Sequence, residues 1–109
     1  SLYVIEAFGT WNSSNNQITY NFIITNNSGS SVTIRGIVLV LMRTRTVPEA
    51  GENAGSLLTG LTAQVPAKGT YRSSMYSFNV SRDFSYDYYI AARATGVNTT
   101  YNMVEDYAP

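Results

Sequence analysis

The run 32–42 (VTIRGIVLVLM) constrains the fold of this chain most, because its middle is apolar at every position from Ile37 to Leu41. Successive side chains of a β-strand point to opposite faces of the sheet, so both faces of this strand need a cover. In a small antiparallel domain one face enters the core and the other usually meets water. The pattern therefore predicts a strand whose second face is covered by another part of the chain or by a second molecule.

The composition excludes most catalytic chemistry. At 109 residues the chain is expected to form one domain, residues 1–109, whose core needs neither metal nor disulfide. It has no cysteine, so a thiolate zinc site, a disulfide and a cysteine nucleophile are ruled out. It also has no histidine, the commonest general base and metal ligand. We therefore predict a non-enzymatic domain with no catalytic residues, no cofactor and no metal.

The charges give no reason to expect nucleic acid or a membrane surface as a partner. Seven basic residues balance seven acidic ones, and Lys68 is the single lysine. Charged residues make up 13% of the chain, against about 25% in an average protein. Hydroxyls and amides are abundant instead, a composition typical of secreted and envelope-exposed β proteins. We expect an extracytoplasmic location at the cell envelope or cell surface.

No stretch reaches the roughly 18 apolar residues that a membrane helix needs, and we expect no signal peptide in residues 1–109. The chain opens directly in a strand pattern at Leu2 and Tyr3. One expectation is therefore that it is the soluble part of a longer protein whose N-terminal anchor was removed, with no membrane contact by the domain itself.

Period-two alternation recurs along the chain and predicts about seven short strands without helix. The expected strands are 2–8, 18–25, 32–42, 57–65, 70–80, 86–95 and 99–105. The longest irregular segment is expected at 43–60, which contains Pro48 and three glycines. We predict an all-β, antiparallel, immunoglobulin-like sandwich, with a jelly roll or small barrel as the alternative. The expected buried side chains are Ile18, Tyr20, Phe22, Ile24, Phe78, Tyr88 and Ile90.

Carboxylates are the remaining groups with catalytic or metal-binding potential. Nothing in their spacing forces any two of them into one cleft, and solvated loops and strand edges explain all six. Glu49, Glu52 and Asn53 offer oxygen ligands for calcium but lack the alternating acidic pattern of an EF-hand. The carboxylates considered are Glu49, Glu52, Asp83, Asp87, Glu105 and Asp106.

Nine tyrosines and one tryptophan suggest a carbohydrate-binding module, in which exposed rings stack on sugars. Core packing is the better interpretation for the tyrosines that stand in phase with aliphatic neighbours, namely Tyr20, Tyr76, Tyr86 and Tyr88. The candidates for exposed, sugar-binding rings are Trp11, Tyr89 and Tyr101.

Four Asn-x-Ser/Thr sequons occur, at Asn12, Asn26, Asn79 and Asn98, where about two are expected by chance. All four fall in expected turns or strand ends, where a glycan would fit. They support an exposed, extracytoplasmic domain.

The apolar strand has two interpretations of equal weight. In the first, the segment 43–60 folds over it. In the second, Ile37, Leu39 and Leu41 face outward and form an interface, while Val38 and Val40 face the core. The second interpretation makes the chain a homo-oligomer or a binder of a protein partner. The candidate interface residues are Ile37, Val38, Leu39, Val40 and Leu41.

The succession of a strand, an asparagine-rich turn and a long apolar strand (ITYNFIITNNSGSSVTIRGIVLVL) resembles the extracytoplasmic β-sandwich domains of archaeal surface-filament proteins. The archaellum stator proteins F and G are the nearest match, followed by archaeal pilin sandwich domains. The resemblance implies an anchoring role in motility, in which the sandwich binds a surface-layer or filament-system protein while an N-terminal helix sits in the membrane.

We therefore expect a structural, non-enzymatic interaction domain of the cell envelope that self-associates or binds a protein partner through the apolar strand. The alternatives are a carbohydrate-binding module and a pilin-type structural subunit.

Overall fold

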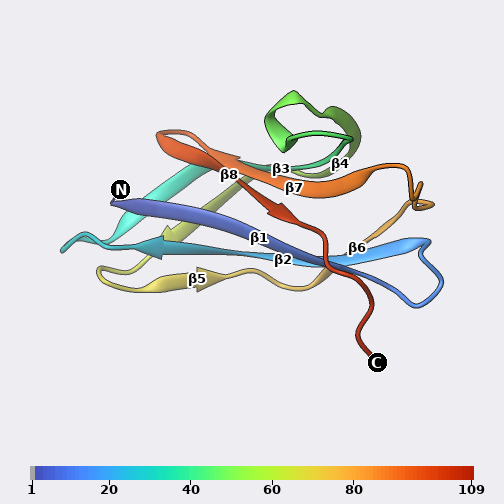
Figure 1. Cartoon of the computed structure of the whole chain (residues 1–109). Helices are drawn as coiled ribbons and strands as arrows, with labels where there is room; N and C mark the ends of the chain where they lie inside the picture. Colours follow the sequence, from blue (N-terminus) through green and yellow to red (C-terminus); the bar gives the residue numbers. More distant parts are fainter. Residues whose placement is uncertain (1) are drawn as a thin grey trace.

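A computed structural model describes residues 2–109 as two antiparallel sheets packed face to face (Figure 1). The first sheet contains β1 (Tyr3–Trp11), β2 (Gln17–Asn26), β5 (Thr70–Arg72) and β6 (Tyr76–Asn79). The second contains β3 (Val32–Thr44), β4 (Glu52–Val65), β7 (Asp87–Ala94) and β8 (Val97–Met103). Between residues 2 and 109 the one helical element is the 3-10 turn η1 (Pro48–Ala50), so no helix there could span a membrane. The predicted all-β sandwich is confirmed.

The strand order is immunoglobulin-like with one switch. The first sheet runs β1-β2-β5, with β6 also pairing β2, and the second runs β4-β3-β7-β8. In the constant-type immunoglobulin order the fourth strand belongs to the sheet of the first two strands. Here β4 pairs with β3 instead, so the fourth strand has moved to the second sheet.

Eight strands form where about seven were expected, because the segment 70–80 is divided. β5 and β6 both pair with β2 but are separated at residues 73–75. At that point the Ser73 hydroxyl accepts the backbone N–H of Phe22 at 2.8 Å, and the Ser73 N–H donates to the Phe22 carbonyl at 3.0 Å. A side chain thus replaces one rung of the ladder, and the strand is interrupted.

The core lies between the two sheets and follows the alternation read from β2 and β7. Of the seven side chains expected to be buried, six are buried: Ile18, Tyr20, Phe22, Ile24, Tyr88 and Ile90. Phe78 is only half-buried, because it stands on the edge strand β6. Its ring lies where a side chain on Gly55 would be, with a Cβ built there only 2.5 Å from the ring.

The prediction of a long irregular segment at 43–60 was wrong. β3 continues to Thr44 and β4 begins at Glu52, so the irregular part shrinks to 45–51. Glycines inside β4 accommodate an uneven ladder rather than a loop, since the β3–β4 register shifts at four points and Gly60 has φ +68°. The segment has the glycine-rich composition of a loop because bulged edge strands also require glycine.

Two buried tyrosines fix the sheets. The Tyr20 hydroxyl on β2 donates to the Leu57 carbonyl on β4 at 2.5 Å, which ties the first sheet to the second. Burial, and secondarily the neighbouring Tyr76, raises the pKa of Tyr20. Near the start of β7, the Tyr88 hydroxyl accepts the backbone N–H of Asp83 at 2.9 Å, the arrangement of an immunoglobulin tyrosine corner.

The open side between β1 and β8 is closed by hydrogen bonds to the edge of β1. Thr100 and Asn102 of β8 donate from their side chains to the carbonyls of Ile5 and Ala7. Glu105 then forms a parallel bridge with Thr10: its N–H donates to the Gly9 carbonyl and its carbonyl accepts the Trp11 N–H. The segment after β8 therefore extends the first sheet by a short strip, and the edge of β1 is not left open.

Candidate functional site

The two faces of the apolar strand β3 are the reverse of the expected arrangement: the face expected to point outward points into the core. Ile37, Leu39 and Leu41 are fully buried and belong to the core cluster, so their assignment as an outward interface was wrong. The register decides this, because Leu39 and Leu41 stand opposite Ala92 and Ile90 of β7, which are core residues. Val38 and Val40 consequently face away from the core.

The outer side of the second sheet is apolar at its centre. Val40 stands opposite Ala91 of β7, and Ala91 stands opposite Tyr101 of β8. Val40 is 8% and Ala91 6% exposed, yet neither belongs to the core cluster. Met42 and Tyr89 form the next cross-strand pair. We call this surface the apolar face: Val38, Val40, Met42, Tyr89, Ala91 and Tyr101.

The chain covers one end of this face. The η1 turn, drawn green in Figure 1, stands on the outer side of the second sheet beside β3 and β4. Below it Thr44 is buried, and its hydroxyl accepts the Thr46 N–H at 2.9 Å. The cover expected from residues 43–60 is thus limited to the end of β3, and Val38, Met42, Tyr89 and Tyr101 remain half-buried.

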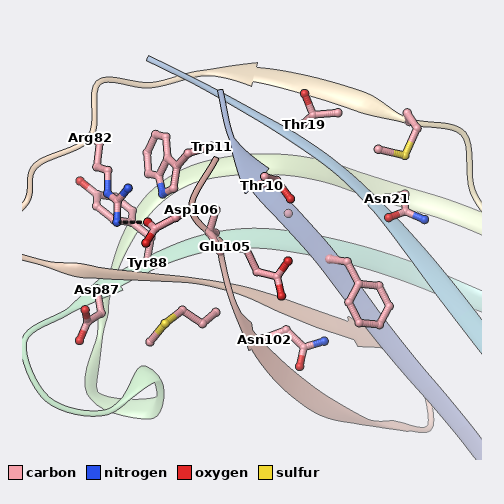
Figure 2. A pocket seen from close by; sticks show the side chains of 15 residues that line it. Thr10, Trp11, Thr19, Asn21, Arg82, Asp87, Tyr88, Asn102, Glu105 and Asp106 are labelled. Atoms are coloured by element: carbon pink, nitrogen blue, oxygen red, sulfur yellow. Dashed lines mark ion pairs between the residues drawn. The ribbon is translucent and has the colours of Figure 1, made fainter. Parts of the chain in front are cut away.

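A groove of about 830 Å³ runs along the outer face of the first sheet and the strip after β8 (Figure 2). It also reaches Asp87, Tyr88 and Met103 of the second sheet. Cross-strand pairs set its lining, since Phe8 is opposite Asn21, and Thr10 is opposite both Thr19 and Glu105. Met75, at the interruption between β5 and β6, also lines it. This part of the lining combines hydroxyl, amide and carboxylate groups with two exposed apolar side chains.

The other end of the groove is an arginine-centred cluster, on the left of Figure 2. Arg82 pairs with Asp106 at 2.8 Å, donates to the Asn15 side chain at 3.0 Å and lies 5.3 Å from the Trp11 ring centre. Trp11 packs edge-on against Tyr88 and is only 1% exposed. Its expected role as an exposed sugar-binding ring was wrong, because β1 points it into the core.

Several charged side chains are engaged in local structure. Arg43 pairs with Glu52 at 2.6 Å, and this contact raises the pKa of Arg43. Hydrogen bonds from Ser85 lower the pKa of Asp83. Among residues 2–109 no three carboxylates come together in a way that could hold a metal ion. The candidates Glu49 and Asp87 are exposed, and neither joins such a group.

The four sequons have different environments. Asn26 is fully buried: its amide donates to the carbonyls of Ser30, Val65 and Pro66, and its oxygen accepts from the backbone and hydroxyl of Ser28. A glycan cannot be attached there, so this candidate was wrong. Asn12 is half-buried, whereas Asn79 and Asn98 are exposed. Glycosylation at those three positions stays a prediction.

Comparison with known proteins identifies a fold and no family. Neither a protein-family model nor a curated protein sequence matches the chain. A solved structure, that of the sporulation control protein Spo0M from Bacillus subtilis, matches with a TM-score of 0.63 at 7% identity. The match covers 100% of this chain and 51% of Spo0M, so the chain spans about half the length of that protein. At this identity the likeness shows the fold alone.

Proposed function

We propose that this domain is a non-enzymatic interaction module of the cell envelope that self-associates through its apolar face. The observation that carries the proposal is the pair Val40 and Ala91 on the outer side of the second sheet. An antiparallel sandwich normally has polar residues on its outer sides. Neither residue belongs to the core cluster between the sheets, so filling that cluster does not account for their apolar character.

The composition around this pair supports a protein as the occupant. Interfaces are enriched in tyrosine, methionine and arginine and depleted in lysine and acidic residues. The apolar face has Tyr89, Tyr101 and Met42 around its centre, and Arg93 stands opposite Val38. The nearest carboxylate of β7, that of Asp87, stands at the start of the strand and lines the groove described above.

A second copy of the chain is the simplest occupant, because an apolar face with few charges is complementary to itself across a two-fold axis. The low charge and the hydroxyl-rich and amide-rich composition support an envelope location. Resemblance to archaellum stator and pilin domains supports a filament-system or surface-layer assembly as the setting.

The test is sedimentation mass over a range of protein concentrations. The unmodified chain should gain mass with concentration, whereas Val40→Lys should remain a monomer because a lysine charge would enter a desolvated interface. Thr19→Lys is the matched control, since Thr19 holds the equivalent central position on the outer side of the first sheet. A chain that stays monomeric throughout, or a Val40→Lys variant that associates as before, would overturn the proposal.

A carbohydrate-binding function at Tyr89 and Tyr101 would predict the opposite behaviour, a monomer whose tyrosine fluorescence responds to sugars. These rings stand diagonally across β7 and β8 beside Ala91. Their position within the apolar face favours protein contact.

A further inference from the structure

We infer that the groove on the first sheet binds a neutral saccharide, at a site separate from the apolar face and independent of self-association. The groove presents an exposed aromatic ring beside a row of polar side chains. Its defining residues are Phe8, Thr10, Thr19, Asn21, Met75 and Glu105.

The polar side chains of this row have unused hydrogen-bonding capacity. Within residues 2–109 the side chains of Thr10, Thr19, Asn21 and Glu105 make no hydrogen bond or ion pair with one another or with the rest of the chain. Together they offer hydroxyl and amide donors and carbonyl, hydroxyl and carboxylate acceptors. A sugar hydroxyl both donates and accepts hydrogen bonds. A mixture of donors and acceptors therefore suits a polyol better than a ligand that only donates or only accepts.

Asn21 is the most informative member of the row. Asparagine is disfavoured inside strands, yet Asn21 stands in the middle of β2. Four of the other nine asparagines use their side chains locally, since Asn12, Asn16, Asn26 and Asn53 fix turns or strand ends. The Asn21 amide supports no turn and no neighbouring strand, and it lines the groove.

The apolar part of the groove provides a surface for the ring of a sugar. Phe8 stands directly opposite Asn21 and is 43% exposed. Its neighbours in β1, Ala7 and Gly9, are buried, so Phe8 points to the outer face. Met75 is 63% exposed and lines the same groove. A site in which an aromatic face lies next to a few convergent polar groups is the usual form of a small-molecule site.

The charges of the groove exclude anionic ligands. Its one guanidinium, that of Arg82, is already paired with Asp106, and Glu105 adds a carboxylate beside Thr10. A phosphorylated ligand or a nucleic acid would therefore meet repulsion without a free cation. An added peptide strand is also disfavoured, because the edge of β1 is occupied by residues of β8 and by Glu105.

The experiment is an NMR titration of the isotope-labelled chain with glucose, mannose, galactose and N-acetylglucosamine in turn. We expect at least one sugar to shift the Asn21 side-chain amide and the backbone amides of Phe8 and Thr10 in a saturable way. Amides of β3 should not move. Asn21→Ala and Phe8→Ala should each weaken binding about tenfold, whereas Thr25→Ala, on the same side of β2 but outside the groove, should bind as the unmodified chain does.

Failure has a clear form. Absence of saturable shifts with all four sugars, unchanged binding by Asn21→Ala, or shifts centred on Tyr89 and Tyr101 would each overturn the assignment of this groove. Because the variants leave the apolar face untouched, the sedimentation result for Val40→Lys is not affected by any of these outcomes.

Discussion

The two outer faces of the sandwich differ, although the two inner faces are alike. On both sheets the inner positions are filled with apolar side chains, isoleucine and tyrosine among them. On the outside, β2 of the first sheet has four polar residues, Gln17, Thr19, Asn21 and Thr25, and one apolar residue, Ile23. β3 of the second sheet has Val38, Val40 and Met42 at its centre. Core packing requires only the inward-facing residues to be apolar. The outward-facing residues therefore reflect what each outer surface contacts. The difference teaches that apolar residues in a strand are not all evidence for a core.

The edges of the two sheets differ as well. β1 and β2 pair in one unbroken register, whereas the β3–β4 ladder shifts four times. Bulges on an edge strand such as β4 twist it and discourage pairing with another chain. Self-association of this domain is therefore expected through the face of the second sheet and not through its edge.

The largest expected effect tests the inner face against the outer face of one strand. Leu39→Lys should lower the free energy of unfolding by more than about 4 kcal/mol, because it removes a core side chain and buries a charge. Val40→Lys, one residue further on, should cost much less, because Val40 lies outside the core cluster and the long lysine stem can carry its charge to solvent on the outer side of the sheet. Chemical denaturation of both variants measures the difference. Equal loss of stability in the two variants would break the division between the faces.

The next effect concerns the polar exception among the inner positions of β2. Asn26→Ala should cost about 2 to 4 kcal/mol, because three carbonyls lose their donor and one buried amide is removed. Asn27→Ala is the control, since the neighbouring side chain is exposed. Thermal unfolding of the two variants is the measurement, and a stable Asn26→Ala variant would show that the end of β2 is held by other contacts.

The smallest expected effect comes from two substitutions that exchange a polar and an apolar residue between the two outer faces. Val40→Thr should cost about 1 kcal/mol, and more at high protein concentration if association covers this residue. Thr19→Val should stay within about 0.5 kcal/mol at every concentration, because Thr19 makes no hydrogen bond that the change would break. Denaturation at two protein concentrations separates these results. If Val40→Thr lowers the free energy of unfolding by the same amount at both protein concentrations, the apolar face is not an interface.

Much of the fold was predictable because local alternation was enough to assign it. The inner residues of β2 and β7 were predicted correctly from their period of two. In β4 the prediction was wrong because glycines and register shifts look like a loop when the partner strand is unknown. The burial of Asn26 was missed for a related reason: its carbonyl partners at Val65 and Pro66 are about forty positions away in the chain.

By itself, the sequence determined an all-β sandwich without cysteine or histidine chemistry, and it determined that both sides of β3 are apolar. Only the tertiary structure decided which side of β3 fills the core, because a continuous apolar run contains no alternation from which to choose. The groove also depends on tertiary structure, since the bridge from Glu105 to Thr10 joins opposite ends of the chain. Local patterns encode periodicity, whereas register and long-range pairing arise from contacts between segments that the sequence does not show side by side.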